Sequence, residues 1–387
     1  MDSSRFEKLL GEVRLIASDI AAKHADDVDR NARFPIEAVT ALRGSKVLSA
    51  GVPEELGGGG CTMLQLANLC SALSRSCSSS GMILAMHLIQ LACLARHGLE
   101  SDFFRSYLSE LVHEQYLIAS VTSEVGTFGD TRSSICAVET EGECFRLKKE
   151  ATTVSYGAYA DALLVTARQS ADASSSDQVL VLLKKGDYQL TQSSHWDTLG
   201  MRGTCSPGGI LVGKAPVKQI VPGSYAVSSP QTMVPYAHIL WASLWWGIAA
   251  DAMSRASSIV RAQARKNPGV IPVGAADLAK AMAELEVMKN HWMSCAADFD
   301  SPRMTRDELT TMPWALKMNN LKIKASEAAP HIVHRALQII GMRGYHNGTK
   351  FSIGRHYRDA LSASLMISNE RLIAQQSTMW LMVKDHL

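Results

Sequence analysis

The spacing of the apolar residues changes twice along this chain, and this change constrains the fold more than any other feature. At both ends of the chain, apolar residues recur at helical spacing. Between them, short runs rich in Val, Leu and Ile alternate with turn residues, which is typical of strands. The length of 387 residues also exceeds what one core usually serves. We therefore predict an α+β protein of three domains: helical residues 1–115, a central antiparallel β domain at 116–222, and a C-terminal helical bundle at 223–387.

The last helix that the pattern predicts carries an amide within an apolar stripe. Leu361, Leu365, Asn369 and Leu372 fall on one face of that helix. A buried amide without a partner costs about 1–3 kcal/mol. Asn369 therefore bonds a neighbouring helix or contacts a ligand, and its position alone does not decide between the two.

Composition and charge argue against several classes of function. The 39 basic and 37 acidic residues leave a net charge of +2, which gives no sign of nucleic-acid binding. No apolar run of about 18 residues lacks a polar break, and the segment ILWASLWWGIAADAM comes closest, so we expect no membrane insertion. The N-terminus is charged throughout and lacks the apolar core of a signal peptide, which predicts a cytoplasmic protein. The eight cysteines show no CxxC pair and no zinc-site spacing, so we expect reduced thiols and no metal.

Short motifs spread over nearly the whole chain resemble those of the acyl-CoA dehydrogenases, in the same order. They are GVPEELGGGG at 51–60, SEVGTFGDT at 123–131, GMRGT at 200–204, RALQIIGMRGY at 335–345 and GRHYRDA at 354–360. The segments ARKNPGVIPVG and RDALSASLMISNERL look like the bacterial acyl-CoA or acyl-carrier-protein dehydrogenases. The resemblance implies the fold of that family, with a C-terminal four-helix bundle, and a homo-oligomer that is a tetramer or a dimer.

The resemblance also implies FAD, bound between the β domain and the C-terminal helices and reaching a neighbouring subunit. Arg265 matches an Arg that supplies the permanent cation a pyrophosphate needs. Asn369 stands where the family has a Thr that contacts the diphosphate, which favours a ligand contact. Thr153 replaces an aromatic residue and Met342 replaces the second Gly of a pair. The cofactor residues that the resemblance implies are Ser120, Val121, Thr122, Ser123, Thr153, Val154, Ser155, Arg265, Gln338, Gly341, Asn369 and Arg371.

The reaction that the family implies is α,β-desaturation of an acyl thioester carried on CoA or acyl carrier protein. A carboxylate removes the α-proton while a hydride leaves the β-carbon for the flavin. In most members the carboxylate lies seven residues beyond the Ala of the RDA motif, and here that position is Ile367. Another branch has its Glu early in the helix after the β domain, and here that position is Ala237. Neither side chain can take a proton.

Two other residues are candidates for the base. Glu370 lies about one turn beyond Ile367 on the predicted helix, although the pattern favours a solvated surface carboxylate beside Arg371. His87 lies on an apolar helix next to the expected substrate cavity, and a core histidine is the alternative interpretation. The substrate residues implied by the resemblance are Gly129, Arg202 and Met366.

Three functions stay open at this point. The first is an FAD-dependent acyl-thioester dehydrogenase or oxidase with a non-standard base. The second is a flavin-dependent monooxygenase on the same fold, which needs no Glu at these positions. The third is a flavoprotein or degenerate scaffold without redox turnover.

Overall fold

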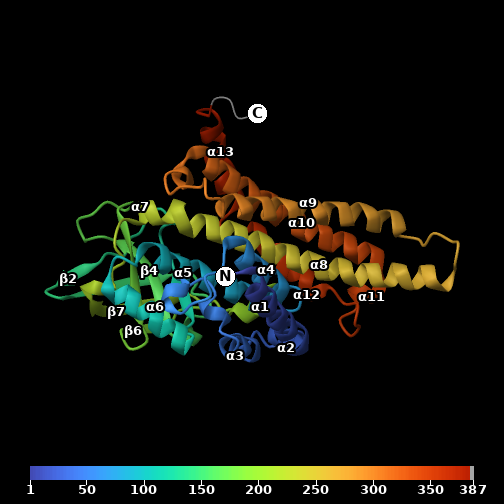
Figure 1. Ribbon diagram of the computed structural model, residues 1–387, viewed down its shortest axis with the longest axis horizontal. Coiled ribbons are helices and arrows are strands. Elements are labelled where there is room, and N and C mark those ends of the chain that lie inside the picture. Colours follow the sequence, from blue (N-terminus) through green and yellow to red (C-terminus); the bar gives the residue numbers. More distant parts are fainter. Residues whose placement is uncertain (384–387) are drawn as a thin grey trace.

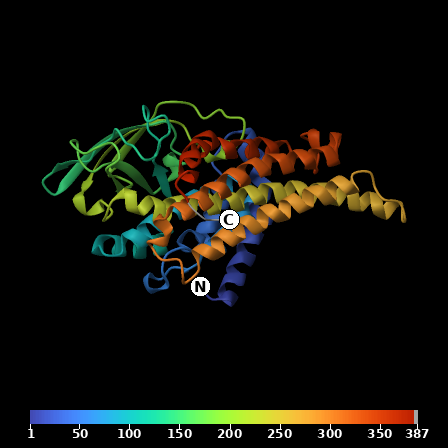
Figure 2. The same ribbon diagram turned by 90° about the horizontal axis from the view of Figure 1, so that it is seen from above.

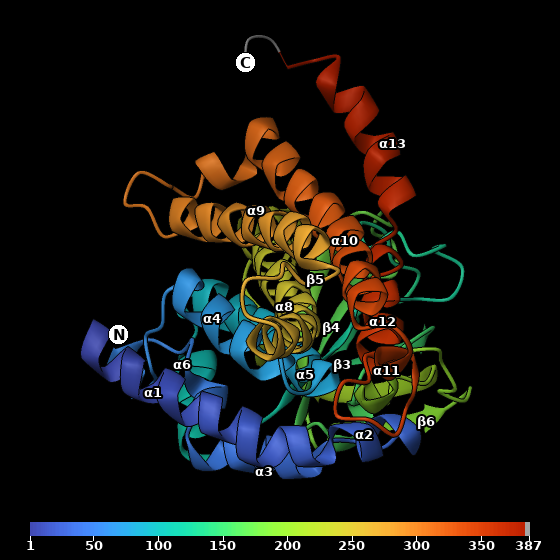
Figure 3. The ribbon, with the colours of Figure 1, turned by 90° about the vertical axis from the view of Figure 1, so that its right-hand side faces the viewer.

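The computed structural model describes residues 1–383, and its long helices extend away from a β region that lies at one end (Figures 1 and 2). The N-terminal helices begin with one continuous rod, in which α1 and α2 flank a wider π-helical turn at Ile16–Ala21. The rod and the N-terminal helices that follow it in the chain pack along one side of the longest helices (Figure 3). Their bounds are α1 Ser3–Leu15, α2 Ala22–Arg30, α3 Ile36–Gly44, α4 Met63–Ser74, α5 Ser78–His97 and α6 Asp102–Glu114.

One helix of this region is long and apolar enough to cross a membrane by length and composition, namely α5. The sequence interpretation expected no such run and placed the nearest one in the tryptophan-rich segment instead. The helix lies inside the protein, since 94% of its most apolar window is buried. Its apolar side chains therefore pack against α4, α8 and β1.

The β region forms two sheets, with strand orders β1-β4-β5 and β2-β3-β7-β6. Every pair is antiparallel except β1 with β4, which is parallel, so the expected antiparallel domain contains one parallel pair. Strands β4 and β5 are buried along nearly their whole length, whereas β3 alternates between buried and exposed residues. The strands are β1 Ile118–Val121, β2 Glu139–Glu141, β3 Cys144–Ala151, β4 Ala162–Arg168, β5 Gln178–Lys184, β6 Tyr188–Gln192 and β7 Gly209–Pro216.

The C-terminal helices are organised around α8, which packs against α4, α5, α9, α10 and α12 (Figure 3). Its first half, residues 235–250, is buried nearly all round, and Trp245 within it is fully buried. This arrangement joins the N-terminal and C-terminal helices in one shared core. The helices are α7 Tyr225–Ser228, α8 Val234–Lys266, α9 Ala275–Phe299, α10 Met312–Ile340, α11 Met342–Tyr345, α12 Gly354–Leu361 and α13 Asn369–Trp380.

The predicted long last helix is wrong, because the chain leaves the helix between α12 and α13. Residues 365–368 form a turn, and Ile367 has a φ of 46°, in the left-handed region that a β-branched residue seldom adopts. Leu365 is 78% exposed and does not continue an apolar stripe. Glu370 therefore lies in the first turn of a new helix, and its direction no longer follows from that of Ile367.

Candidate functional site

Hydroxyl groups gather where β1 and β3 end. The Oγ of Ser120 lies 2.8 Å from the Oγ1 of Thr122. The Ser123 hydroxyl donates to the Thr153 carbonyl at 2.9 Å and accepts from the Thr153 N–H at 3.1 Å. These bonds hold the segments after the two strands together, so the structure brings four of the predicted cofactor residues into one place.

The side chains of the other predicted cofactor residues near these strand ends point in different directions. The Ser155 hydroxyl accepts from that of Ser206 at 2.8 Å, which fixes the segment after β3 to the turn before β7. The side chains of Val121 and Val154 are buried in the β core. Only the backbone of these two valines can therefore face a cofactor.

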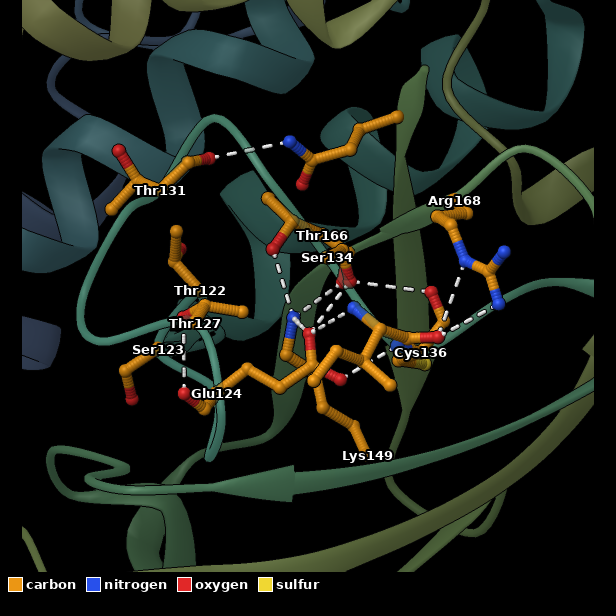
Figure 4. A network of polar contacts seen from close by, with 12 residues as sticks. Thr122, Ser123, Glu124, Thr127, Thr131, Ser134, Cys136, Lys149, Thr166 and Arg168 are labelled. Carbon is orange, nitrogen blue, oxygen red and sulfur yellow. Dashed lines mark hydrogen bonds and ion pairs between the residues drawn. The ribbon is translucent and has the colours of Figure 1, made fainter. Parts of the chain in front are cut away.

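A buried carboxylate of the SEVGTFGDT motif, Glu124, shapes the loop that follows β1 (Figure 4). It accepts hydrogen bonds from the Ser134 hydroxyl at 2.7 Å, the Ile135 N–H at 3.0 Å and the Cys136 N–H at 2.6 Å. The carboxylate thus fixes the far end of the loop and sets the path of residues 125–133 between the two ends.

The counter-charge of Glu124 is Lys149 on β3, whose Nζ lies 3.3 Å from the carboxylate (Figure 4). The ammonium also donates to the carbonyl and hydroxyl oxygens of Thr166 on β4, at 2.7 and 3.0 Å. Burial lowers the pKa of Lys149, and the nearby carboxylate opposes that shift. The pair ties both sheets to the loop.

Loop 126–130 meets the first turn of α13 through Arg371. Its guanidinium donates to the carbonyl oxygens of Phe128 and Gly129. Both loop residues have positive φ, at 50° and 77°, and the Phe128 ring is 90% exposed. Two of the predicted ligand residues, Gly129 and Arg371, are therefore in direct contact with each other.

We expect Arg371→Met to loosen this loop without unfolding the protein. The carbonyls of the loop can turn to water, so the cost to global stability should stay below about 1 kcal/mol. Limited proteolysis and hydrogen exchange should show faster cleavage and exchange confined to residues 126–132. The matched control is Arg14→Met, an exposed arginine on α1. Unchanged exchange in Arg371→Met would contradict a clamping role.

The turn before α13 is held from α10 by Lys322. The buried ammonium donates to the Ile367 carbonyl at 2.7 Å and to the Asn369 Oδ1 at 2.6 Å. The Asn369 amide nitrogen donates to the Ser326 hydroxyl at 3.0 Å. Asn369 thus has an inter-helix partner, as one of its two sequence interpretations proposed, and it lies at the meeting point of α10 and α13.

Neither position where a base was sought carries an acid. Ala237 is buried on α8, and its neighbour His238 bonds the Met318 carbonyl through Nδ1 at 3.0 Å. Burial lowers the pKa of His238 to about 3, so this ring is neutral at physiological pH. Ile367 is half-buried, and Met366 beside it packs against the core.

The structure engages both ring nitrogens of the candidate base His87. Its Nε2 lies 2.7 Å from the Leu48 carbonyl, so it is the protonated nitrogen. Its Nδ1 accepts from the Ile118 N–H at 3.0 Å. Burial lowers the pKa of the ring to about 4. With both nitrogens bonded to backbone, His87 fits a structural role, fastening α5 to the start of β1.

The other candidate base, Glu370, has an exposed side chain in the first turn of α13. The predicted substrate residue Arg202 donates to the Asp29 carbonyl at 2.8 Å, to the Thr198 carbonyl at 2.7 Å and to the Asp197 carboxylate at 2.8 Å. These bonds favour the turn contact, because they tie the segment before β7 to α2.

The remaining predicted cofactor residues lie at the opposite end of the molecule. Arg265 is exposed at the end of α8, and Gln338 and Gly341 are exposed at the end of α10. At about 1.5 Å per residue, the length of α8 separates Ala237 from Arg265 by about 40 Å. In Figure 1 the β region lies at one side of the molecule, and α11 and the end of α8 lie towards the other. The predicted set therefore divides into two groups that one bound dinucleotide does not join within one chain.

Comparisons with known proteins agree over most of the chain. Family models described as the N-terminal and C-terminal domains of acyl-CoA dehydrogenase match residues 3–115 and 230–366. The human mitochondrial short-chain specific acyl-CoA dehydrogenase is 27% identical over 345 residues, which cover 87% of this chain and 80% of that protein.

Two solved structures share the fold. Butyryl-CoA dehydrogenase from Megasphaera elsdenii has a TM-score of 0.82 at 18% identity, covering 98% of this chain and 100% of that one. The dibenzothiophene monooxygenase TdsC from Paenibacillus sp. A11-2 has a TM-score of 0.81 at 18% identity, covering 97% of each chain. At these identities the likeness concerns the fold alone.

Proposed function

Because this chain belongs to the acyl-CoA dehydrogenase family, we propose that it desaturates an acyl thioester, carried on CoA or acyl carrier protein, with a base other than the usual glutamate. As a member of that family it is a flavin-dependent oxidoreductase, and its cofactor is FAD. The observation that carries the proposal is the contact of loop 126–130 with the first turn of α13. It brings the hydroxyl-bearing ends of β1 and β3 close to the turn where the family has its base.

The residues around this contact fit FAD. Short hydroxyls and backbone groups at 120–123 and 153–155 suit the polar edge of a flavin ring. Two cations without carboxylate partners within ion-pair distance among residues 1–383, Lys322 and Arg371, suit a diphosphate. We propose that Arg265, Gln338 and Gly341 act on the FAD of a neighbouring subunit, which accounts for their distance and makes the enzyme an oligomer.

Bound FAD would supply the acceptor for the hydride that leaves the β-carbon. This chain must then supply a group that takes the α-proton and donors that polarise the thioester carbonyl. We propose Glu370 as the proton acceptor, because its carboxylate has no hydrogen-bond partner among residues 1–383, whereas His87 has both nitrogens occupied. Gly129 and Met366 belong to the same junction and would border the thioester.

A second candidate function rests on one observation, the lack of an acid at both Ile367 and Ala237. A flavin monooxygenase needs no carboxylate there, and the monooxygenase TdsC shares this fold. A scaffold without turnover is the third possibility. Several of the relatives are mitochondrial proteins, and a cytoplasmic location of this chain stays a proposal.

Anaerobic titration separates these functions. We expect the purified protein to be yellow and its flavin absorbance to bleach when acyl-CoA or acyl-carrier-protein thioesters of increasing chain length are added. Oxygen consumption driven by reduced flavin, with no bleaching by any thioester, would instead identify a monooxygenase. A protein that shows neither reaction, with or without bound flavin, would be the scaffold.

The base is tested by two substitutions with opposite expected effects. Glu370→Gln should slow bleaching by about 100-fold or more, since general-base catalysis contributes about 10²–10⁴-fold. Ile367→Glu puts a carboxylate at the family position and should accelerate bleaching. The control is Glu286→Gln, an exposed glutamate on α9. A Glu370→Gln variant that bleaches at the wild-type rate would remove Glu370 as the base.

A further inference from the structure

Three hydroxyl groups form a chain that runs from the candidate site into the β region. The Oγ of Ser155 lies 2.8 Å from the Oγ of Ser206, which lies 2.8 Å from the Oγ1 of Thr204. The chain ends at the Met201 carbonyl oxygen, 2.8 Å from the Thr204 Oγ1. Ser206 and Thr204 are buried, whereas Ser155 is half-buried. Ser155 is therefore the end of the chain that a ligand can reach.

The turn at residues 201–205 holds the inner end of this chain in place. Met201 and Cys205 have φ values of 51° and 43°, in the left-handed region that residues other than Gly seldom adopt. The Met201 N–H donates to the carboxylate of Asp359 on α12 at 2.6 Å, and the Met201 carbonyl accepts from the Thr204 N–H at 3.1 Å. Since the surrounding structure imposes this backbone, the oxygens of the chain are fixed and only their hydrogens can turn.

In one orientation the hydrogens of the chain point outwards. Ser206 donates to Ser155, so the contact between Ser206 and Thr204 takes the Thr204 hydrogen. Ser155 then has its own hydrogen free and is a donor towards the site. The Met201 carbonyl keeps the Thr204 N–H but not the Thr204 hydroxyl hydrogen.

In the other orientation the hydrogens point inwards. The Thr204 hydrogen has a second acceptor at the same distance of 2.8 Å, the Met201 carbonyl. When Thr204 donates there, Ser206 donates to Thr204 and Ser155 donates to Ser206. Ser155 then presents a lone pair to the site. This orientation serves all three contacts of the chain, so it is favoured when nothing outside accepts the Ser155 hydrogen.

A hydroxyl that can reverse its role suits a ligand atom that reverses its own. The carbonyl oxygens of a flavin ring accept hydrogen bonds in both oxidation states. The ring nitrogen that takes the hydride has only a lone pair before reduction and carries an N–H afterwards. The hydrogen on that nitrogen and both electrons come from the β-carbon of the acyl thioester. This nitrogen first needs a donor and then needs an acceptor.

We propose that Ser206 and Thr204 are positioning residues, which let the Ser155 hydroxyl donate to this ring nitrogen before reduction and accept from it afterwards. The proposal rests on the proposed function. Because the inward orientation serves one contact more than the outward one, the chain favours the reduced ring. It therefore raises the midpoint potential of the bound flavin.

The midpoint potential of the holoprotein, measured by titration against a reference dye, tests the proposal. We expect Ser206→Ala to move the equilibrium by about three- to tenfold towards oxidised flavin, the usual effect of one hydrogen bond. A tenfold change lowers the potential by about 30 mV for two electrons. Thr204→Val keeps the shape of the side chain and should shift the equilibrium in the same direction, so it serves if Ser206→Ala fails to fold. Thr204→Ser keeps the hydroxyl and should stay within about twofold of the wild type. The control is Ser254→Ala, an exposed serine on α8.

A double-mutant cycle separates positioning from a general structural effect. If Ser206 acts through Ser155, Ser206→Ala should leave the potential unchanged in a Ser155→Ala background. An equal shift in that background, or no shift in both Ser206→Ala and Thr204→Val, would overturn the proposal. Expected shifts in a protein that no thioester bleaches would keep the hydroxyl chain and remove desaturation. Bleaching with an unchanged potential would do the reverse, and a wild type that binds no flavin would overturn both.

Discussion

Replacing Lys149 with methionine should destabilise the folded protein by about 3–5 kcal/mol, the usual result of removing one partner of a buried ion pair. Methionine fills the space of the lysine stem, so the loss is one of charge and hydrogen bonds. Glu124 would keep its three loop donors but lose its counter-charge, and the Thr166 carbonyl would lose its donor. Urea unfolding at pH 7.5, followed by circular dichroism, measures the change.

The matched control is Lys148→Met on the same strand. Lys148 is exposed, because neighbouring residues of β3 alternate between the two faces, and its loss should change the free energy of unfolding by less than about 0.5 kcal/mol. A Lys149→Met variant within 1 kcal/mol of the wild type would show that the pair does not hold the loop. Since Glu124 positions the loop after Ser123, we also expect weaker FAD binding in Lys149→Met.

The order of helices and strands could be predicted because it follows from local periodicity. The hairpin of β4 and β5 follows this pattern, since its polar loop at 169–177 lies between two apolar runs. The parallel pairing of β1 with β4 could not be read in this way, since it joins segments about forty residues apart. Pairing partners of that kind depend on tertiary packing and not on the residues of either strand.

The break before α13 was missed for a similar reason. The apolar residues from Leu361 to Leu372 keep helical spacing in the sequence. Only the left-handed φ of Ile367 shows that the helix stops. That conformation is held by Lys322, which lies 45 residues earlier in the chain. A single backbone angle stabilised by a distant side chain leaves no local sequence pattern.

Both buried lysines nevertheless left a signal that could have been used. Lys149 occupies the apolar register of its strand, in step with Phe145 and Leu147. Lys322 continues the apolar spacing of Met318 on α10. A lysine in an apolar register indicates one of two things. Either the helix or strand has been assigned wrongly, or the lysine is a buried charge with a function. The rule that singled out Asn369 would have found both, although not their partners.

Acid should destabilise this protein well before its carboxylates are protonated. Three histidines, His87, His238 and His356, are buried, and burial lowers their pKa values to about 4, 3 and 4. The unfolded chain takes up these protons near pH 6.5, whereas the folded chain resists them. The stability due to the neutral rings is therefore complete above pH 6.5 and is lost as the pH falls towards 4.

Between pH 7.5 and 5 we expect a loss of about 1–2 kcal/mol for each of the three histidines. Urea midpoints at constant ionic strength measure it, and pH 5 keeps most carboxylates charged. His238→Gln retains a donor for the Met318 carbonyl and removes the titration, so about 1–2 kcal/mol of the pH dependence should disappear even if the variant is less stable at pH 7.5. The control is His113→Gln, an exposed histidine on α6, which should leave the pH dependence unchanged. An unaltered pH dependence in His238→Gln would mean that this ring is hydrated in the folded protein and that the interior at the start of α8 is open to water.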